Sequence, residues 1–408
     1  MIPAALKHQF ACLAVVLMWA CTTTPAPITS PQPPDETQVT DAVGLDPASI
    51  SSLEELPGWQ TASIGPALEA FRKSCNRWST RAADAQISTR APYAGRVSDW
   101  SPVCASLEGV SDPAAARLVL STLLVPVAID PGEQRARFTG YFEPQIDARR
   151  APVWPYVQPV PGLPSDLVQV DGSEIGLTEG ERVPAQRLPD GSLRPYPERK
   201  DIVIETSRVL GYAHPADVFF LQIQGSGRLR FSDGETVRAA YAAHNGQPFR
   251  STANWLLRTD RIERGEASMQ GIRAWMDRAG FEEAQLAMNQ NPRFVFFSEQ
   301  PIEDAGLGPK GAFNVPLTPF GSVAVDTSLH PLGVPMFIET SAPGLGGLWQ
   351  GLMIAQDTGG AIKGPVRGDL YFGTGAAAGD RAGTMNAPGR MWVVLPKSVA
   401  AQLKSGSS

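Results

Sequence analysis

The chain has 408 residues and a formal net charge of -6, with 43% hydrophobic and 19% charged residues. The length allows roughly two to three domains, and the composition is that of a folded globular protein. The negative charge balance argues against a general affinity for nucleic acid, which requires basic surfaces. High counts of glycine (39) and proline (37), with few long helical periods, predict a turn-rich and mainly β architecture.

The first residues have the pattern of an export signal. Lys7 and His8 precede the apolar run FACLAVVLMWAC, which is shorter than the about 20 apolar residues of a transmembrane helix. A small residue before Cys21 predicts a lipoprotein-type signal over residues 1–21, with Cys21 as the lipidated residue; ordinary signal cleavage is the alternative. Because Thr22 rather than Asp follows the cysteine, we expect a periplasmic protein anchored to the outer membrane.

Residues 22–57 are rich in Pro, Thr, Ser and Asp and contain few large apolar side chains. Such a segment buries too little surface to fold, so it predicts a disordered tether. After it come Cys75 and Cys104, the two cysteines of the predicted folded part. In an exported protein this pair favours a disulfide, with two buried thiols as the alternative.

The predicted elements begin with a helix over residues 64–78, where apolar positions recur at intervals of three and four. A second helix is expected to start at Asp112-Pro113, since Asp is a good N-cap and Pro a good first residue. Strand-like sequence follows at 134–144. The segment VFFLQIQGSGRLRF then predicts a β-hairpin with Gly225-Ser226-Gly227 at its turn.

A helical block is predicted over residues 252–288, and the face of SMQGIRAWM within it favours packing. After NPRFVFF, the short runs GSVAVD, VPMFIET, GLMIAQD and MWVVLP predict strands. Their spacing suits a small closed barrel better than a doubly wound sheet.

The residues exclude several common kinds of chemistry. The histidines His214, His244 and His330 are isolated, and neither HExxH nor clustered His/Cys ligands occur, so we expect no metal and no cofactor. No GxSxG elbow and no Walker loop are present. The remaining candidates for catalysis are carboxylates.

Two aspartates lie in the glycine-rich segment AQDTGGAIKGPVRGDLYFGTG (355–375). Asp357 ends an apolar run before Gly359-Gly360, a setting in which an aspartate often caps a turn. Asp369 lies beside Gly368 and an apolar stretch, which can desolvate a carboxylic acid and raise its pKa. From these residues alone, both a structural and a catalytic role remain open.

Several separated segments resemble the membrane-bound lytic murein transglycosylase A family. They occur in family order between about residues 60 and 398, and they include TGYFEP, FFLQIQGSGRLRF, YAAHNGQPFRS, SMQGIRAWM, NPRFVFF, VPLTPFGSVAVD and the glycine-rich segment of residues 355–375. The resemblance implies a double-psi β-barrel catalytic domain, here residues 58–137 plus 301–400. It also implies a smaller inserted β domain over residues 138–300, with a groove for a glycan strand between the two.

The resemblance further implies cleavage of the bond between N-acetylmuramic acid and N-acetylglucosamine without water, leaving a 1,6-anhydromuramoyl end. Asp369 would act first as general acid and then as base, and Asp357 would support the site. The expected partners are peptidoglycan glycan strands and, through the lipid anchor, the outer membrane. A muramidase that uses water and both aspartates, and a non-catalytic murein-binding lipoprotein, are the alternatives.

Other side chains are secondary candidates for binding the substrate. Gln224, on a predicted strand, and the backbone amides of Ser226 and Gly227 suit sugar hydroxyls and acetamido groups, although a plain hairpin is the alternative. Tyr141 and Thr139 would stack on and bond to a sugar ring, with a place for Tyr141 in the core as the alternative. Lys363 and Asp380 would orient Asp369 or bind the strand, whereas Glu143 is disfavoured as a second catalytic carboxylate.

Overall fold

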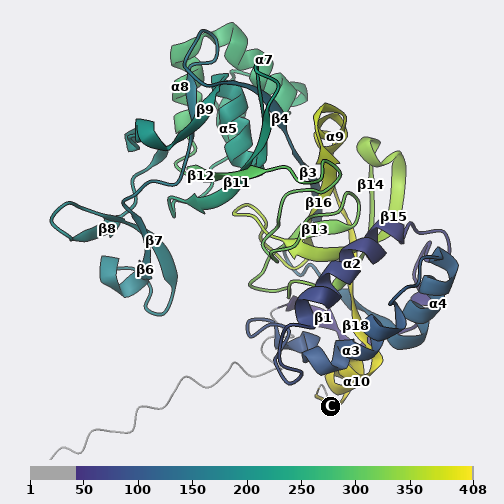
Figure 1. Ribbon diagram of the computed structural model, residues 1–408. Coiled ribbons are helices and arrows are strands. Elements are labelled where there is room, and N and C mark those ends of the chain that lie inside the picture. The colour runs from purple at the N-terminus through teal and green to yellow at the C-terminus, as the bar shows by residue number, and fades with distance from the viewer. Residues whose placement is uncertain (1–42, 407–408) are drawn as a thin grey trace, which may run out of the picture. The chain divides into compact units, whose positions relative to one another are not determined.

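The computed structural model describes residues 43–406, and Cys21 and its signal lie outside this part. A nine-stranded sheet takes strands from both ends of the described chain and follows the order β1-β2-β18-β14-β15-β13-β16-β3-β17 (Figure 1). Its strands are β1 (Leu45–Asp46), β2 (Leu124–Ile129), β3 (Arg137–Glu143), β13 (Ser322–Val325), β14 (Pro335–Ala342), β15 (Gly347–Asp357), β16 (Arg367–Thr374), β17 (Asn386–Ala387) and β18 (Gly389–Pro396).

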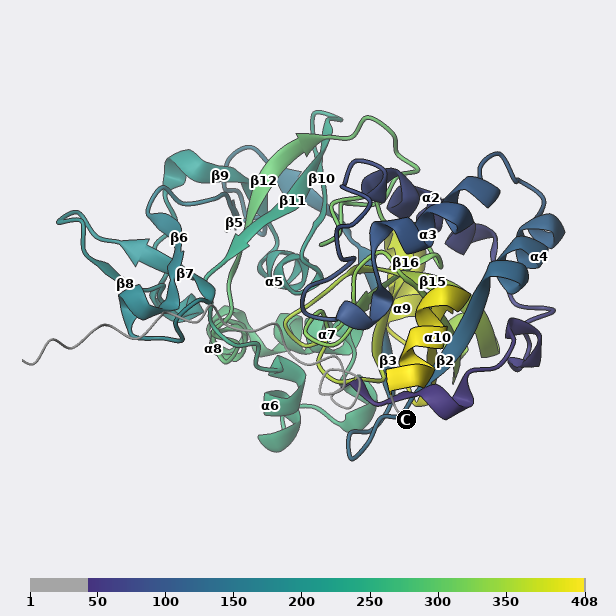
Figure 2. The ribbon, with the colours of Figure 1, turned by 90° about the horizontal axis from the view of Figure 1, so that it is seen from below.

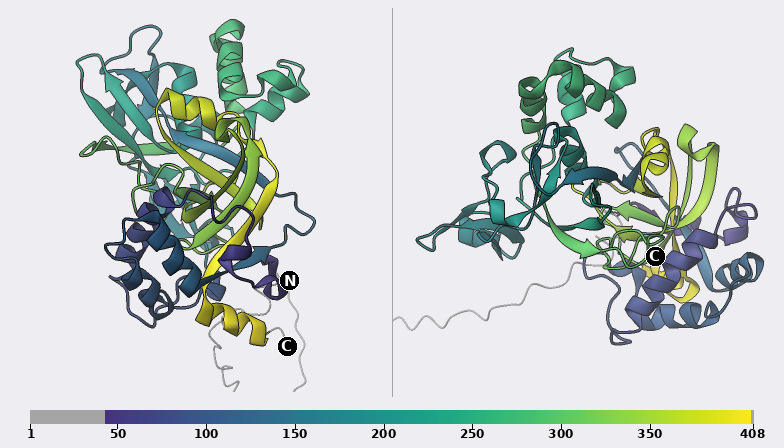
Figure 3. Two further views of the ribbon diagram at one scale, coloured as in Figure 1. Left: turned by 90° about the vertical axis from the view of Figure 1, so that its right-hand side faces the viewer. Right: turned by 45° about the horizontal axis from the view of Figure 1, so that its top comes forward.

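This sheet curls into a near-closed barrel, whose green to yellow strands bend toward one another in the left view of Figure 3. Helices accompany it, and Figure 2 shows α10 beside β2. These helices are α2 (Gly65–Trp78), α3 (Val97–Ser106), α4 (Pro113–Leu123), α9 (Ala376–Ala382) and α10 (Lys397–Gly406).

The middle of the chain forms two further sheets. A six-stranded sheet has the order β12-β11-β10-β4-β9-β5, and a three-stranded sheet has the order β6-β7-β8. The strands are β4 (Gln145–Arg149), β5 (Gln158–Pro161), β6 (Leu167–Asp171), β7 (Arg182–Arg187), β8 (Leu193–Pro195), β9 (Val209–Ala213), β10 (Gly227–Phe231), β11 (Thr236–His244) and β12 (Val295–Pro301). The helices between them are α5 (Pro215–Gln224), α6 (Thr252–Arg258), α7 (Met269–Ala279) and α8 (Phe281–Asn289).

Many expected elements are present where the sequence placed them. The helices at 64–78 and after Asp112 are α2 and α4, and the Asp112 carboxylate caps α4 by accepting from the Ala115 amide at 2.9 Å. The fold is nevertheless mixed α/β rather than mainly β, because helices contribute about as much as strands. None of the helices within residues 43–406 has the length and apolar character needed to cross a membrane.

The predicted hairpin around Gly225-Ser226-Gly227 is wrong in its first arm. Residues Pro215–Gln224 form helix α5, which begins with a proline and ends at Gly225. Gly225 has φ 85°, the left-handed conformation that often terminates a helix. An apolar run of this length fits a buried helix as well as a strand, and packing on both sides of α5 decides for the helix.

The predicted tether is also too long at its C-terminal end. Leu45–Asp46 pairs as β1 with β2, and the side chains of Val43 and Leu53 are fully buried. A few apolar residues are sufficient here because β1 extends an existing sheet and uses its free edge for hydrogen bonds. The remainder of the tether, residues 22–42, lies outside the described part.

Helix α2 fastens the N-terminal helices to the barrel. It buries Leu68, Phe71 and Trp78 in the main core, and each such side chain contributes roughly 1.5–3 kcal/mol when fully buried. A disulfide joins Cys75 on α2 to Cys104 on α3, with the two Cα atoms 5.6 Å apart. The disulfide therefore links two helices, and neither cysteine lines the pocket described below.

Glu143, at the end of β3, forms buried ion pairs that connect the two larger sheets. Its side chain is fully buried and accepts from Arg228 Nε on β10 at 2.8 Å and from Arg238 Nε on β11 at 2.6 Å. Thr374, on β16, donates to the same carboxylate at 2.8 Å. These contacts occupy both carboxylate oxygens, which explains why Glu143 is unsuited to act on a substrate.

We predict that Glu143→Gln strongly destabilises the fold. It removes the charge that compensates two buried guanidinium groups, and breaking a buried ion pair of this kind costs about 3–5 kcal/mol. Urea unfolding followed by tryptophan fluorescence measures the loss. Glu299→Gln, at an exposed position on β12, is the matched control and should change stability by less than about 0.5 kcal/mol. Equal unfolding midpoints for the two variants would contradict the prediction.

Candidate active site

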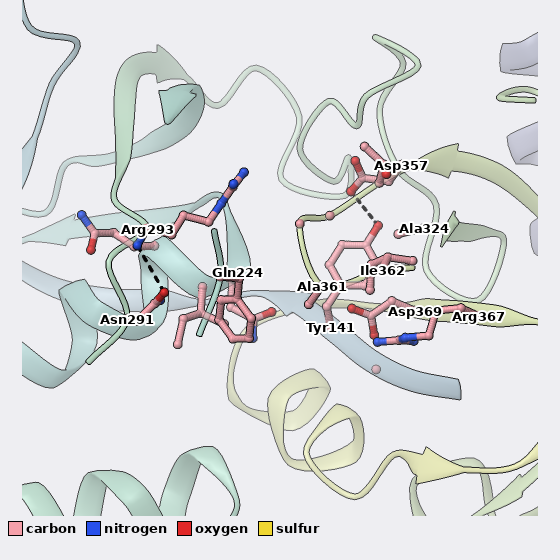
Figure 4. A pocket seen from close by; sticks show the side chains of 17 residues that line it. Tyr141, Gln224, Asn291, Arg293, Ala324, Asp357, Ala361, Ile362, Arg367 and Asp369 are labelled. Atoms are coloured by element: carbon pink, nitrogen blue, oxygen red, sulfur yellow. Dashed lines mark hydrogen bonds between the residues drawn. The ribbon is translucent and has the colours of Figure 1, made fainter. Parts of the chain in front are cut away.

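The two catalytic candidates lie in one pocket of about 230 Å³ (Figure 4). Its lining comes from the barrel sheet and from the middle of the chain. The barrel strands and the loop after β15 supply Gly140, Tyr141, Ala324, Asp357, Ile362, Arg367 and Asp369, together with residues 358–361. The middle of the chain supplies Gln222, Ile223, Gln224, Phe249, Asn291 and Arg293.

Strand pairing sets the position of Asp369. It lies on β16, which runs parallel to β3 and places Asp369 directly opposite Thr139. The Thr139 hydroxyl donates to Asp369 Oδ1 at 2.6 Å and accepts from Arg367 Nη2 at 2.8 Å. The Thr139 oxygen accepts a hydrogen bond from Arg367, so the single proton of the hydroxyl group is free to point to Asp369 Oδ1. Oδ2 is left as the oxygen that can carry the proton of the acid.

The environment of Asp369 favours the protonated acid. Desolvation raises the pKa of Asp369 above its usual value, and the charges of Arg367 and Arg137 and the hydrogen bond from Thr139 oppose that rise. Neither arginine forms an ion pair with Asp369 within the part of the chain that the structure describes. Arg367 instead donates to the carbonyl oxygen of Gly368 at 2.6 Å and to Thr139. Desolvation therefore has a larger effect on the pKa of Asp369 than the two arginines, which do not contact its carboxyl group.

Asp357 is held on both of its carboxylate oxygens. It ends β15, where Oδ1 accepts from the Ala312 amide and Oδ2 from the Tyr141 hydroxyl, each at 2.9 Å. Burial raises the pKa of Asp357, although these hydrogen bonds act in the opposite direction. Tyr141 is only 9% exposed and packs against Tyr371. Its hydroxyl thus anchors Asp357, and little of its ring is free to stack on a ligand.

Ala324 separates the two aspartates. In the sheet it pairs with Asp357 on β15 and with Asp369 on β16. Two strand spacings put the backbones of the aspartates on the order of 9–10 Å apart. The small Ala324 side chain leaves the floor of the pocket open between the two carboxyl groups.

The facing wall of the pocket carries polar groups on a second set of elements. Gln224, at the end of α5, accepts from the Phe142 amide at 3.1 Å through Oε1, which leaves its amide nitrogen available to a ligand. Asn291 is 2% exposed and fixes the loop before β12, because its Oδ1 accepts from the amides of Arg250 and Arg293. Figure 4 shows the Arg293 side chain extending from this wall toward the loop that follows Asp357.

The structure brings five of the predicted site residues together: Thr139, Tyr141, Gln224, Asp357 and Asp369. The others lie elsewhere. Ser226 and Gly227 belong to the turn and first residue of β10 and do not line the pocket, and a side chain at position 227 would meet Leu221 at 2.4 Å. Lys363 is mostly exposed and lies 3.4 Å from Asp326. Asp380, on α9, accepts from Gln270 at 3.3 Å.

Sequence reasoning missed Asn291, Arg293 and Ala324 as pocket residues. The first two lie in NPRFVFF, where polar residues directly precede a buried strand, and that position was the available signal. Ala324 gave no signal, since a small residue in a strand becomes informative only when its neighbours across the sheet are known. Residues 43–406 contain no cluster of His, Cys, Asp and Glu suited to a metal ion.

Two family models match the chain. Residues 137–298 match the MltA specific insert domain, and residues 321–395 match the 3D domain. The second segment contains both aspartates, and the first contains the facing wall. The membrane-bound lytic murein transglycosylase A of Escherichia coli (strain K12) is 33% identical over 281 residues, which is 66% of this chain and 68% of that protein.

Solved structures give the same result. A membrane-bound lytic murein transglycosylase from Agrobacterium tumefaciens aligns with a TM-score of 0.75 at 27% identity, over 86% of this chain and 98% of that one. E. coli MltA with bound chitohexaose aligns with a TM-score of 0.59 at 26% identity, over 82% and 91% of the two chains. The fold, the paired aspartates and these matches together show that the chain belongs to the membrane-bound lytic murein transglycosylase A family.

Proposed function

We propose that this enzyme cleaves the β-1,4 bond between N-acetylmuramic acid and N-acetylglucosamine in peptidoglycan without using water, and leaves a 1,6-anhydromuramoyl end. Asp369 is the catalytic residue. The observation that carries the proposal is the pair of contrasting aspartates in one pocket: Thr139 orients Asp369 through Oδ1 and leaves Oδ2 open, whereas both oxygens of Asp357 are held. Burial raises the pKa of Asp369, as a general acid requires. The E. coli homologue was solved with chitohexaose, and we extend glycan binding to this chain.

In the first step, the protonated Oδ2 of Asp369 donates to the glycosidic oxygen, and the bond from that oxygen to C1 breaks. The N-acetylglucosamine unit leaves with a new hydroxyl group. Asp369 is then a carboxylate beside an electron-poor C1, and Arg367, held nearby through Thr139, favours this charged form. The two cations that oppose the initial protonation therefore assist once the proton has gone.

In the second step, the 6-hydroxyl of the muramoyl residue attacks C1 and gives its proton to Asp369. The acid is restored and the sugar closes a ring on itself. A glycosidase that uses water needs a second carboxylate as nucleophile or base. Here the nucleophile is already attached to the reacting sugar, and well-oriented intramolecular attack can supply about 7–11 kcal/mol. One general acid and base is then sufficient.

Asp357 supports the site in this proposal. Its two oxygens accept from Tyr141 and from the Ala312 amide, so it is poorly placed to activate water. The same contacts fix the start of the loop 358–362 that lines the pocket. Gln224 on the facing wall is proposed to contact the sugar through its amide nitrogen, and Lys363 and Asp380 are proposed to bind the strand farther from the bond that is cleaved.

We extend the proposal to domain organisation and location. The barrel domain has double-psi connectivity, and because β1 and β3 belong to its sheet it comprises residues 43–143 plus 301–406 rather than 58–137 plus 301–400. The inserted domain then begins after Glu143, extends to residue 300 and lines the other side of the glycan groove. Residues 1–21 act as a lipoprotein signal, and lipidated Cys21 anchors the enzyme to the outer membrane from the periplasmic side. The relatives are named as membrane-bound, which supports the anchor.

We predict that Asp369→Asn lowers the turnover of purified peptidoglycan by about 10²–10⁴-fold, the usual contribution of a general acid or base. Mass spectrometry of the wild-type products should show muramoyl ends lighter by one water than hydrolysed ends. Hydrated, reducing ends would instead support the two-carboxylate muramidase. Full activity in the variant would contradict the role of Asp369, and the non-catalytic murein-binding alternative predicts no cleavage product from the wild type either.

We predict that kcat/KM falls as the pH rises through the raised pKa of Asp369, since only the protonated acid can start the reaction. Initial rates of release of soluble fragments, measured from pH 4 to 9, give the profile. A rate that increases steadily across this range would contradict the assignment.

Stability provides the control for this pH dependence. A buried carboxyl group whose pKa is raised on folding destabilises the protein above that pKa and has no such effect below the unfolded value of about 3.9. Asp369→Asn should therefore unfold at a higher temperature than the wild type at pH 8. That advantage should shrink toward zero as the pH approaches 4.

We predict that Tyr141→Phe reduces kcat without weakening the binding of chitohexaose. The substitution keeps the buried ring but removes the hydroxyl that holds Asp357 Oδ2, and an unsatisfied buried acceptor costs about 1–3 kcal/mol. Steady-state kinetics and calorimetric titration with chitohexaose separate the two effects. A loss of affinity with unchanged kcat would show that the tyrosine acts by contact with the sugar.

A further inference from the structure

Arg293 is a cation in the pocket wall with no acidic partner among the residues that the structure describes. Its Nη1 donates to the carbonyl oxygen of Gln247 at 3.3 Å, and its amide donates to Asn291 Oδ1 at 3.3 Å. The remaining guanidinium N–H groups have no partner within residues 43–406. Both aspartates line the same pocket, yet neither forms an ion pair with Arg293.

Three other arginines of this protein have carboxylate or backbone acceptors for their guanidinium groups. Arg228 and Arg238 share the Glu143 carboxylate, and Arg199 donates to the backbone carbonyls of Asn291 and Arg293. Burial lowers the pKa of Arg293 below its usual value, which indicates a poorly hydrated cation. The titratable groups beside it are Tyr241 and His244, and burial lowers the pKa of His244 to about 4. Both neighbours are therefore uncharged at neutral pH, and neither compensates the guanidinium.

The position of this cation is built into the fold. Asn291, which is almost fully buried, fixes the backbone on which Arg293 lies. On the opposite side, a Cβ atom added to Gly360 would lie 3.2 Å from the Arg293 Cζ atom. The guanidinium thus rests against bare backbone in the loop that follows Asp357. The glycine pair after Asp357 therefore admits a cation as well as forming a turn.

We propose that Arg293 recognises a carboxylate on the muramoyl residue of the substrate and so distinguishes this sugar from N-acetylglucosamine. The inference rests on the proposed function, since it assigns a ligand to a group in the same pocket. N-acetylmuramic acid differs from N-acetylglucosamine by a lactyl ether that ends in a carboxylate or in a peptide stem. A guanidinium with free N–H groups can bind a carboxylate through two parallel hydrogen bonds.

This contact would set the register of the glycan strand. The bond to be cleaved must present C1 of a muramoyl residue to Asp369, and the two sugars of the repeat share the same ring skeleton. A cation across the pocket from Asp369 can read the one substituent that differs. Two sources of the carboxylate fit this chemistry: the lactyl group of a peptide-free residue and the acidic groups of a peptide stem.

The test measures binding rather than catalysis. We would compare Arg293→Gln with Arg250→Gln, each in the inactive Asp369→Asn enzyme, by calorimetric titration at two salt concentrations. Arg250 is exposed, lies outside the pocket and carries the same charge, so it controls for the loss of a positive charge. The three probes are peptide-free glycan strands with lactyl carboxylates, glycan strands with peptide stems, and chitohexaose, which has no carboxylate.

Losing a charged hydrogen bond should weaken the binding of a carboxylate-bearing probe by about 10–100-fold. We expect Arg293→Gln to produce this loss while changing chitohexaose affinity by less than about twofold, and Arg250→Gln to leave all three probes nearly unchanged. A loss confined to peptide-free strands identifies the lactyl carboxylate, and a loss confined to peptide-bearing strands identifies the stem.

Equal weakening of all three probes would overturn the proposal, because it would mean that Arg293 only supports the pocket. Unchanged binding of both muramoyl probes would overturn it as well. If Arg293→Gln does not fold, Gly360→Ala provides the second variant. Its Cβ atom would lie 3.2 Å from Arg293 Cζ and forces the guanidinium to shift by a few tenths of an ångström, so we expect a smaller loss with the same selectivity for the muramoyl probes. Product mass tests the lytic reaction separately, so failure of this inference and failure of the proposed function give different results.

Discussion

The parallel pairing of β3 with β16 is the constraint on which the site depends. It joins residues more than two hundred positions apart in the chain and places Thr139 opposite Asp369. The same strand carries Tyr141, which holds Asp357, and ends at Glu143, whose ion pairs fasten β3 to β10 and β11. A shift of one residue would turn each side chain to the other face of the sheet. Register and buried charge thus secure the catalytic geometry together.

The pKa of Asp369 depends on how far the neighbouring arginines lie from its carboxyl group, and not only on which charged residues surround the pocket. Arg367 and Arg137 lie near Asp369, but the Thr139 hydroxyl stands between Arg367 and the acid, so desolvation governs the pKa. Direct contact with either guanidinium would ionise the carboxyl group and remove its initial proton. An acid that must both give and regain a proton benefits from this arrangement, because desolvation favours the protonated form at the start and the nearby cations stabilise the carboxylate once the proton has left.

Local sequence signals predicted a helix or strand correctly where the signal was compatible with only one kind of secondary structure. The apolar spacing of α2 and the Asp-Pro start of α4 both indicate a helix and do not fit a strand. The run in α5 was predicted as a strand because an apolar segment fits both structures, and only its burial between neighbouring elements decides. Gln224 therefore reaches the pocket from a helix end, whereas Ser226 and Gly227 do not reach it. The tether was predicted too long because pairing with a sheet edge needs few apolar residues.

The sequence by itself indicated the family and singled out the two aspartates and the two cysteines, because these depend on residue identity and order. That Cys75 and Cys104 form a disulfide was decided by the structure. It also indicated a glycine-lined turn after Asp357. Tertiary structure alone decided that Ala324 lies between the aspartates, that Thr139 separates Arg367 from Asp369, and that Arg293 rests against Gly360. The physical reason is that pKa values and free hydrogen-bonding groups depend on distances across the fold, which neighbouring residues in the chain do not fix.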